Sequence, residues 1–201
     1  MAKSGYKQIY ESLLPQLARC DFTEAAPRLG FVCSDANSLS VKFLGRDFTV
    51  SAKGVEPADG GSVNVNDRSL IAYYVLSTGS GEPEYSFLPL RHFSRSIIFQ
   101  GSDTNWMTDP LSREFSGDYP KFRVAAEKIG AVFMGNSKNG DYLWRLSAFP
   151  KIPLQIAYSE ADDEFPCEIK INFDSGVLRF MGFETVAFLN GSIVNALTFS
   201  L

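Results

Sequence analysis

Apolar and polar residues alternate in several short runs of the last third of the chain, which is the spacing of strands with one buried face. The runs with this pattern span residues 131–134, 142–147, 152–158, 167–173 and 177–180. The segments that join them are too short for crossover helices, so we expect an antiparallel meander over residues 131–181. A longer segment with helical spacing at 183–198 predicts a helix that closes the chain.

The N-terminal end of the chain has the spacing of helices instead. An apolar stripe runs through residues 6–20, where Pro15 is expected to kink the helix or divide it in two. Asp21 and Gly30 are of the residue types that begin and end a second helix between them. We therefore expect a helical N-terminal part at about residues 5–30.

The middle of the chain alternates between the two kinds of element. The strand candidates are residues 31–33, 39–43, 47–51, 85–88 and 96–99, and the helix candidates are residues 67–76, 111–115 and 121–129. Asp67 is expected to cap the first of these helices, whose apolar residues lie on nearly all sides and predict burial. Loops that contain Gly and Pro are expected at 53–62 and 77–84.

Helices at the front and middle of the chain, with an antiparallel meander behind them, are typical of the α+β class. We expect a single α+β domain over residues 1–201, with an antiparallel sheet and packed helices. A mixed sheet is the alternative pairing. A chain of 201 residues is long enough to bury a core of this kind.

Composition and charge indicate which kinds of partner and which cellular compartment to expect. The formal net charge is −4 and the basic residues are scattered, so nucleic acid is not expected as a partner. No apolar stretch reaches the length of a membrane span, and the N-terminal residues lack the apolar core of a signal peptide. Cys20, Cys33 and Cys167 form no Cys-x-x-Cys pair, which excludes a zinc ribbon or an iron–sulfur cluster built from this chain alone. We therefore expect a cytoplasmic protein with no membrane association.

The densest group of chemically active residues is Asp-Asp-Glu-Phe-Pro-Cys at 162–167, between two predicted strands. Asp162, Asp163 and Glu164 could ligate a hard cation with Asp174 or Glu160 in support, since carboxylate oxygens are the ligands of such ions. Asp163 and Glu164 could instead pair with Arg46, Arg91 or Arg95 as structural anchors, or form a solvated hairpin tip. The lack of EF-hand spacing favours the hairpin tip, and no metal site is predicted.

His92 is the only histidine, which excludes metal centres that need several histidines. Cys167 and His92 could together form an activated thiol, but nothing in the sequence orients the two residues. A cysteine at this position of a strand is more often a small core residue.

Arg91, His92 and Arg95 form a small basic group that could hold the phosphate or carboxylate of a small ligand. The alternative is a strand end that pairs with local acids. No Walker motif or Gly-x-Gly-x-x-Gly turn accompanies the group, so nucleotide binding by those routes has no support. Trp106 lies in a predicted loop, where a large aromatic side chain is more often a pocket or interface residue.

Several stretches across the chain match a known family in their order and spacing. They include Arg28-Leu29-Gly30, Val41-Lys42-Phe43-Leu44-Gly45-Arg46, Leu70-Ile71-Ala72-Tyr73-Tyr74, Phe99-Gln100-Gly101, Phe149-Pro150-Lys151-Ile152-Pro153-Leu154, Asp163-Glu164-Phe165-Pro166 and Phe173-Asp174. In these stretches the chain resembles an uncharacterised prokaryotic family called domain of unknown function 3786. The resemblance implies a setting in anaerobic bacteria and archaea but no particular activity, because the family has none assigned. Some members carry an additional iron–sulfur segment that this chain lacks, and Arg91-His92-Phe93-Ser94 departs from the glycine-containing turn of relatives.

The sequence contains no convergent nucleophile, base or metal cluster. This favours a non-catalytic accessory module that binds a small anionic ligand or a protein partner. The alternatives are an enzyme that uses carboxylates as acid and base, and a protein that handles a metal or cofactor in anaerobic metabolism. The sequence identifies no cofactor. The candidate binding residues are Arg46, Arg91, His92, Arg95, Trp106, Asp163, Glu164, Cys167 and Asp174.

Overall fold

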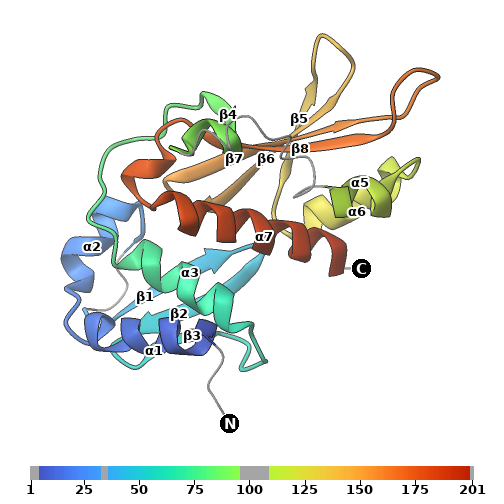
Figure 1. The fold of residues 1–201 in the computed structure, drawn as a ribbon. Helices are drawn as coiled ribbons and strands as arrows, with labels where there is room; N and C mark the ends of the chain where they lie inside the picture. Colours follow the sequence, from blue (N-terminus) through green and yellow to red (C-terminus); the bar gives the residue numbers. More distant parts are fainter. Residues whose placement is uncertain (1–4, 33–35, 96–108, 200–201) are drawn as a thin grey trace.

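The computed structural model describes residues 5–32, 36–95 and 109–199, and these residues form an α+β fold (Figure 1). Within them the strands make two antiparallel sheets, one of three strands and one of five. Figure 1 shows the larger sheet at the top, the smaller sheet below it, and the C-terminal helix crossing between them. The predicted α+β class is confirmed, with two sheets in place of the expected one.

Two helices open the described chain, α1 (Gly5–Leu17) and α2 (Phe22–Leu29). α1 is one helix rather than two, because Pro15 lies near its end on the exposed side. Asp21 caps α2 as predicted, and its carboxylate accepts hydrogen bonds of 2.9 and 3.1 Å from two backbone N–H groups of the first turn. Gly30 ends α2 with a φ of +83°, a left-handed conformation that glycine adopts readily.

The three-stranded sheet consists of β1 (Ser38–Phe43), β2 (Arg46–Ser51) and β3 (Gly54–Pro57). Leu44 and Gly45 join β1 to β2 with left-handed φ angles of 47° and 79°, the pair that a tight type I′ hairpin requires. The strands predicted at 39–43 and 47–51 are therefore confirmed, and this hairpin joins them. The sequence predicts a loop at β3 because of its Gly and Pro, but the structure has a strand there. β3 is at the edge of the sheet, where a proline is tolerated.

Helix α3 (Val65–Val75) begins at Asn64, whose side chain accepts a hydrogen bond of 3.0 Å from the backbone N–H of Asn66. The predicted cap, Asp67, lies inside the first turn and accepts a hydrogen bond of 2.7 Å from Ser192 Oγ. The prediction for this cap is wrong because an asparagine three residues earlier takes the role. The predicted burial of the helix holds for most of its residues.

The five-stranded sheet has the order β4 (Phe87–Pro89), β8 (Glu168–Asp174), β7 (Ile152–Ser159), β6 (Tyr142–Phe149) and β5 (Val132–Asn136). The predicted meander is confirmed for β5 to β8, and β4 adds a strand from the middle of the chain. The predicted strand at 177–180 is wrong, since Val177–Arg179 form the short 3₁₀ helix η3. The carboxylate of Asp174 accepts a hydrogen bond of 2.9 Å from the N–H of Gly176, which turns the chain out of the sheet after β8.

The remaining helices are η1 (Leu90–Phe93), α5 (Asp109–Phe115), α6 (Tyr119–Lys128) and α7 (Phe183–Phe199). The helices α5, α6 and α7 agree with the predicted ones to within a few residues. Of the predicted strand at 31–33, Phe31 and Val32 lie in no strand, and the third residue is outside the described part of the chain. The predicted strand at 96–99 also lies outside the described residues.

One hydrophobic core extends from the helices through both sheets. The ring of Phe149 in β6 stacks on Phe43 of β1, with centroids 5.1 Å apart, and on Tyr74 of α3, with centroids 4.3 Å apart. These three rings join the two sheets and α3, because each comes from a different one of them.

Candidate functional site

Three hollows lie next to one another where the chain enters α7. Their volumes are about 230, 450 and 540 Å³. Tyr73 lines the first and second hollows, Leu178 and Gly182 line the second and third, and Glu184 lines the first and third. Because they share these residues, we treat the three hollows as one surface and call it the α7 groove.

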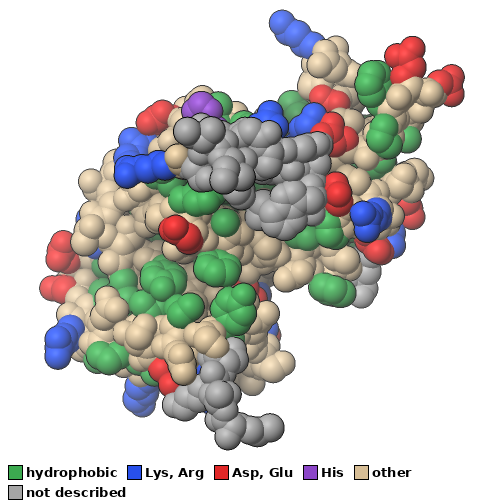
Figure 2. Space-filling model, viewed as in Figure 1, with side chains coloured by type: hydrophobic (Ala, Val, Ile, Leu, Met, Phe, Trp, Pro, Cys, Tyr) green, Lys and Arg blue, Asp and Glu red, His purple; other side chains and the backbone are tan. Residues whose placement is uncertain are grey.

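The first hollow is apolar and lies between α1, α3 and α7. Tyr6 is 47% exposed, Tyr73 is 37% exposed and Phe188 is 45% exposed, although all three are large apolar side chains. The rings of Tyr6 and Phe188 meet edge to face with centroids 6.0 Å apart. Figure 2 shows hydrophobic side chains grouped on this face of the molecule, over α1, α3 and the first half of α7.

The second and third hollows are more polar. Ser77, Thr78 and Arg179 line the second, and Ser94 and Arg95 line the third. Leu178, which is 44% exposed, lies between them. The α7 groove therefore changes along its length from an aromatic end at α1 to a mixed end that carries two arginines.

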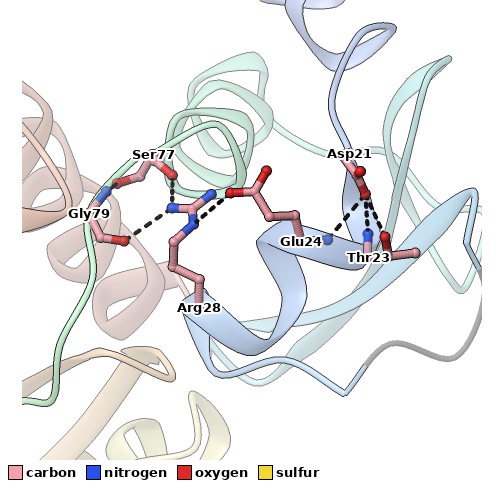
Figure 3. A network of polar contacts seen from close by, with 6 residues as sticks. All are labelled: Asp21, Thr23, Glu24, Arg28, Ser77 and Gly79. Carbon is pink, nitrogen blue, oxygen red and sulfur yellow. Dashed lines mark hydrogen bonds and ion pairs between the residues drawn. The ribbon is translucent and has the colours of Figure 1, made fainter.

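The loop that follows α3 forms one rim of the groove, and an arginine from α2 fixes its path. Arg28 donates hydrogen bonds to the carbonyl oxygens of Ser77 and Gly79, the second at 3.1 Å, and Glu24 lies 3.9 Å from the same guanidinium (Figure 3). Gly79 passes so close to the backbone of Arg179 that a Cβ at this position would overlap the Arg179 carbonyl. The sequence predicts a loop here, and the structure adds that side chains bind its carbonyls.

On the far side of this loop Arg179 is held in place. Its guanidinium donates a hydrogen bond of 2.8 Å to the carbonyl of Glu82 and lies 3.4 Å from the carboxylate of Glu84. Arg95 has no carboxylate within ion-pair distance among the described residues, and it is exposed at the groove edge. Among the described residues that line the groove, Arg95 is thus the arginine without a carboxylate at ion-pair distance, whereas Arg179 has one.

Asp67 links α3 to α7 through its hydrogen bond to Ser192. Burial raises the pKa of the Asp67 carboxyl, while the hydrogen bond from Ser192 and the charge of Arg46 lower it in part. The sequence gives no sign of this contact, since the two residues are 125 positions apart.

The predicted basic group lies on and just after η1. Arg91 and His92 are exposed, and of the three only Arg95 lines the α7 groove. Arg46 is elsewhere, at the start of β2, where it makes two hydrogen bonds of 2.6 and 3.0 Å to the carboxylate of Asp59. The guanidinium of Arg46 lowers the pKa of Asp59 and anchors the loop after β3.

The acidic turn lies at the connection between β7 and β8. Asp163 and Glu164 are exposed there, and among the described residues neither forms an ion pair with Arg46, Arg91 or Arg95. Asp162 organises the turn, because its carboxylate accepts hydrogen bonds from the backbone N–H groups of Phe165 and Glu164, at 2.6 and 2.9 Å. These hydrogen bonds lower the pKa of Asp162.

The other predicted site residues are separate from the groove. Cys167 is buried next to Tyr158, burial raises the pKa of its thiol, and no contact joins it to His92 among the residues described. Asp174 is only 1% exposed and accepts hydrogen bonds from three backbone N–H groups. Trp106 lies outside the described residues.

Over residues 5–32, 36–95 and 109–199, no group of three or more His, Cys, Asp or Glu side chains is placed to hold a metal ion. In the same part of the chain, no helix has both the length and the apolar character needed to cross a bilayer.

Sequence reasoning did not identify the main groove residues. Tyr73 occurs in a predicted helix that is apolar on nearly all sides, so the sequence places it in the core. Phe188 lies in the helix predicted at 183–198, and the sequence contains no signal that singles it out as exposed.

Comparison with known proteins identifies the family of the chain. No curated protein and no solved structure is similar to the chain. A family model described as "Domain of unknown function (DUF3786)" matches residues 21–196, which include the α3 and α7 residues of the groove. The match covers most of the chain, which therefore belongs to the DUF3786 family.

Proposed function

We propose that this chain is a non-catalytic protein-binding module, and that its α7 groove takes apolar side chains from a segment of a partner protein. The observation that carries the proposal is the convergence of four exposed large apolar side chains, Tyr6, Tyr73, Leu178 and Phe188, on one groove. Folded proteins seldom expose contiguous apolar surface unless a partner covers it.

The chemistry of these side chains supports a protein partner. Tyr and Phe are enriched at the centres of protein interfaces, because a rigid ring buries a large area at a small cost in side-chain entropy. The hydroxyls of Tyr6 and Tyr73 add polar atoms at the edge of the apolar surface. A row of adjoining hollows suits the successive side chains of a chain segment, whereas a small ligand usually has one deep pocket.

The charges at the rim give the partner segment a direction. Arg95 lies at the mixed end of the groove and Glu184 borders both this end and the apolar end. A segment with apolar residues followed by a carboxylate would place its acid beside Arg95. Such a rim contact contributes mainly to orientation and association rate.

The alternatives rank behind this proposal. The acids that a carboxylate-dependent enzyme or a metal-handling protein would use are Asp163, Glu164 and Asp174. Two of them are at an exposed hairpin tip, and the third is bound by three backbone amides. No observation on these residues supports either alternative.

A phage-displayed library of random linear peptides, selected on the purified protein, tests the proposal. We expect the selected peptides to be rich in apolar residues. Fluorescence anisotropy measures their affinity for the protein. Phe188→Ala and Tyr73→Ala should each weaken binding about tenfold or more, as interface centres do.

Val124→Ala is the matched control, because Val124 is an exposed apolar residue on α6 and lines none of the three hollows. It should change the affinity by less than about twofold. The proposal is wrong if no peptide is enriched, or if the selected peptides bind the Phe188→Ala protein as tightly as the unchanged protein.

A further inference from the structure

An arginine on the outer face of the five-stranded sheet makes cation–π contacts with two aromatic rings. Arg145 of β6 points away from the buried face, since its neighbours Trp144 and Leu146 are in the core. Its guanidinium carbon lies 5.1 Å from the ring centroid of Tyr85 and 5.6 Å from that of Phe87. Both distances are within the range of a cation–π contact.

This contact requires the arginine to lie flat along the sheet. Phe87 belongs to β4, and the order β4-β8-β7-β6 places two strands between it and Arg145. Three strand spacings amount to about 14 Å, at roughly 4.8 Å each. The guanidinium and the rings can therefore meet only if their side chains extend toward one another over β7 and β8.

Two side-chain amides occupy the surface that the guanidinium crosses. Arg145 is opposite Gln155 of β7, and Gln155 is opposite Asn172 of β8, so the three form one cross-strand row. All three are half-buried. Within the described part of the chain, Arg145 has no carboxylate partner, and neither amide side chain makes a hydrogen bond to another residue.

A strained residue sets the position of one of the rings. Tyr85 has a φ of 54°, in the left-handed region that costs an L-residue about 1–2 kcal/mol. The buried carboxylate of Asp174 accepts a hydrogen bond of 2.5 Å from the N–H of Tyr85 and one of 3.2 Å from that of Glu84. The structure holds this conformation in place, and strain of this kind is concentrated at functional sites.

We propose that Arg145, Gln155 and Asn172 form a binding site for the carboxylate group of a small molecule. Tyr85 and Phe87 lie beside the guanidinium without using its N–H donors in an ion pair, and the fork of these donors matches the two oxygens of a carboxylate. The amides of Gln155 and Asn172 supply further N–H donors along the same row. The site is separate from the α7 groove and does not depend on the proposed function.

The charges around the row favour a singly charged carboxylate over a phosphate. Arg145 is the one cation of the row, and the other basic side chain nearby, Lys170, lies 2.6 Å from the carboxylate of Glu168. Asp174 adds a buried negative charge two residues along β8 on the same face as Asn172. A dianion would therefore meet more repulsion than a monoanion.

Side-chain NMR tests the proposal directly, with sodium acetate as the probe and sodium chloride at equal ionic strength as the reference. We expect the Arg145 Nε–H resonance and the amide resonances of Gln155 and Asn172 to shift and saturate with acetate in the millimolar range, but not with chloride. Arg145→Met should raise the apparent Kd for acetate at least tenfold. Arg145→Lys should also raise it, because lysine keeps the charge but loses the planar fork.

Two further variants test the role of an amide and provide a control arginine. Gln155→Met removes one amide without touching the arginine, and we expect it to raise the Kd for acetate about threefold or more. Arg123→Met, at an exposed position on α6, should leave acetate binding unchanged. Shifts that rise linearly and equally with acetate and chloride would overturn the proposal, as would unchanged acetate binding in Arg145→Met. Tighter saturation by inorganic phosphate than by acetate would overturn the assignment to a carboxylate.

Discussion

The hydroxyl of Tyr74 in α3 donates a hydrogen bond of 2.8 Å to the backbone carbonyl of Leu29, the last residue of α2. The same hydroxyl accepts a hydrogen bond of 3.1 Å from the N–H of Lys151, in the turn between β6 and β7. One phenol thus binds both the end of a helix and the turn of a distant hairpin, while its ring stacks on Phe149 of β6.

Removal of this hydroxyl should destabilise the protein. Tyr74→Phe keeps the stacked ring but leaves the Leu29 carbonyl and the Lys151 N–H without a partner, so we expect a loss of about 1–3 kcal/mol in the free energy of unfolding. Urea denaturation followed by circular dichroism measures it. Tyr73→Phe is the matched control on the neighbouring exposed tyrosine and should stay within about 0.5 kcal/mol. Equal effects from the two variants would contradict the role given to Tyr74.

The free energy of unfolding should fall in alkaline solution because unfolding then allows two buried tyrosines, Tyr74 and Tyr158, to lose their protons. Burial holds the pKa values of Tyr74 and Tyr158 above the usual value of 10, so the folded protein retains these protons more tightly than the unfolded chain does. Their contribution is complete below pH 10 and decreases as the pH rises above it, by up to about 1.4 kcal/mol per pH unit for each tyrosine. Urea unfolding at a series of pH values above 9 should show a smaller decrease for Tyr158→Phe than for the unchanged protein. Identical slopes would exclude this cause.

The turn between β1 and β2 should tolerate no side chain at Gly45. A Cβ there would overlap the carbonyl oxygen of Lys128 at the end of α6, and the φ of 79° is unfavourable for other residues. Gly60 has a similar φ of 69° but open space around it. We expect Gly60→Ala to cost about 1–2 kcal/mol and Gly45→Ala to cost at least about 2 kcal/mol more, since it adds a steric conflict. Thermal unfolding of the two variants measures the difference, and equal Tm values would show that the turn can move away from α6.

Substitution of the buried Asp174 should lower the free energy of unfolding far more than substitution of the exposed Asp163 and Glu164. Asp174→Ala removes the acceptor of three backbone N–H groups at a buried site, which should cost about 3 kcal/mol or more. The double substitution Asp163→Ala and Glu164→Ala, at the exposed turn, should change stability by less than about 0.5 kcal/mol. Chemical denaturation of both proteins measures the contrast. A large loss in the double variant would mean that this turn packs against another part of the protein.

Local signals account for the parts of the fold that the sequence predicts well. Asp21 and Gly30 identify the ends of α2 because a cap depends on one residue and the few that follow it. The short connections of the meander allow only antiparallel pairing. The strand predicted at 177–180 is wrong because of a local contact, since the Asp174 carboxylate accepts a hydrogen bond from the N–H of Gly176 and turns the chain into η3. The strand predicted at 85–88 is present as β4, but its partner β8 comes about eighty residues later, so local signals do not reveal the pairing.

The candidate sites were harder to predict, and for a related reason. The exposure of Tyr73 and Phe188 depends on the spacing of α1, α3 and α7, which come from both ends of the chain. Arg145 lies in a predicted strand, but nothing in the sequence shows that Tyr85 and Phe87 lie against it. Clusters of chemically active residues that are adjacent in sequence, such as the acidic turn, were easy to find, but they do not form the groove.

The place of β4 in the larger sheet has a consequence for how the protein is made. Its residues leave the ribosome well before β8, the strand on which it pairs. At roughly 5–20 residues per second, the delay is about 4–16 seconds, which is long compared with the time in which a hairpin forms. During this interval the nascent chain contains a strand without its partner, together with a tyrosine whose strained conformation nothing yet supports. A nascent chain halted before β8 should therefore be more easily cleaved by protease near Tyr85 than the completed protein.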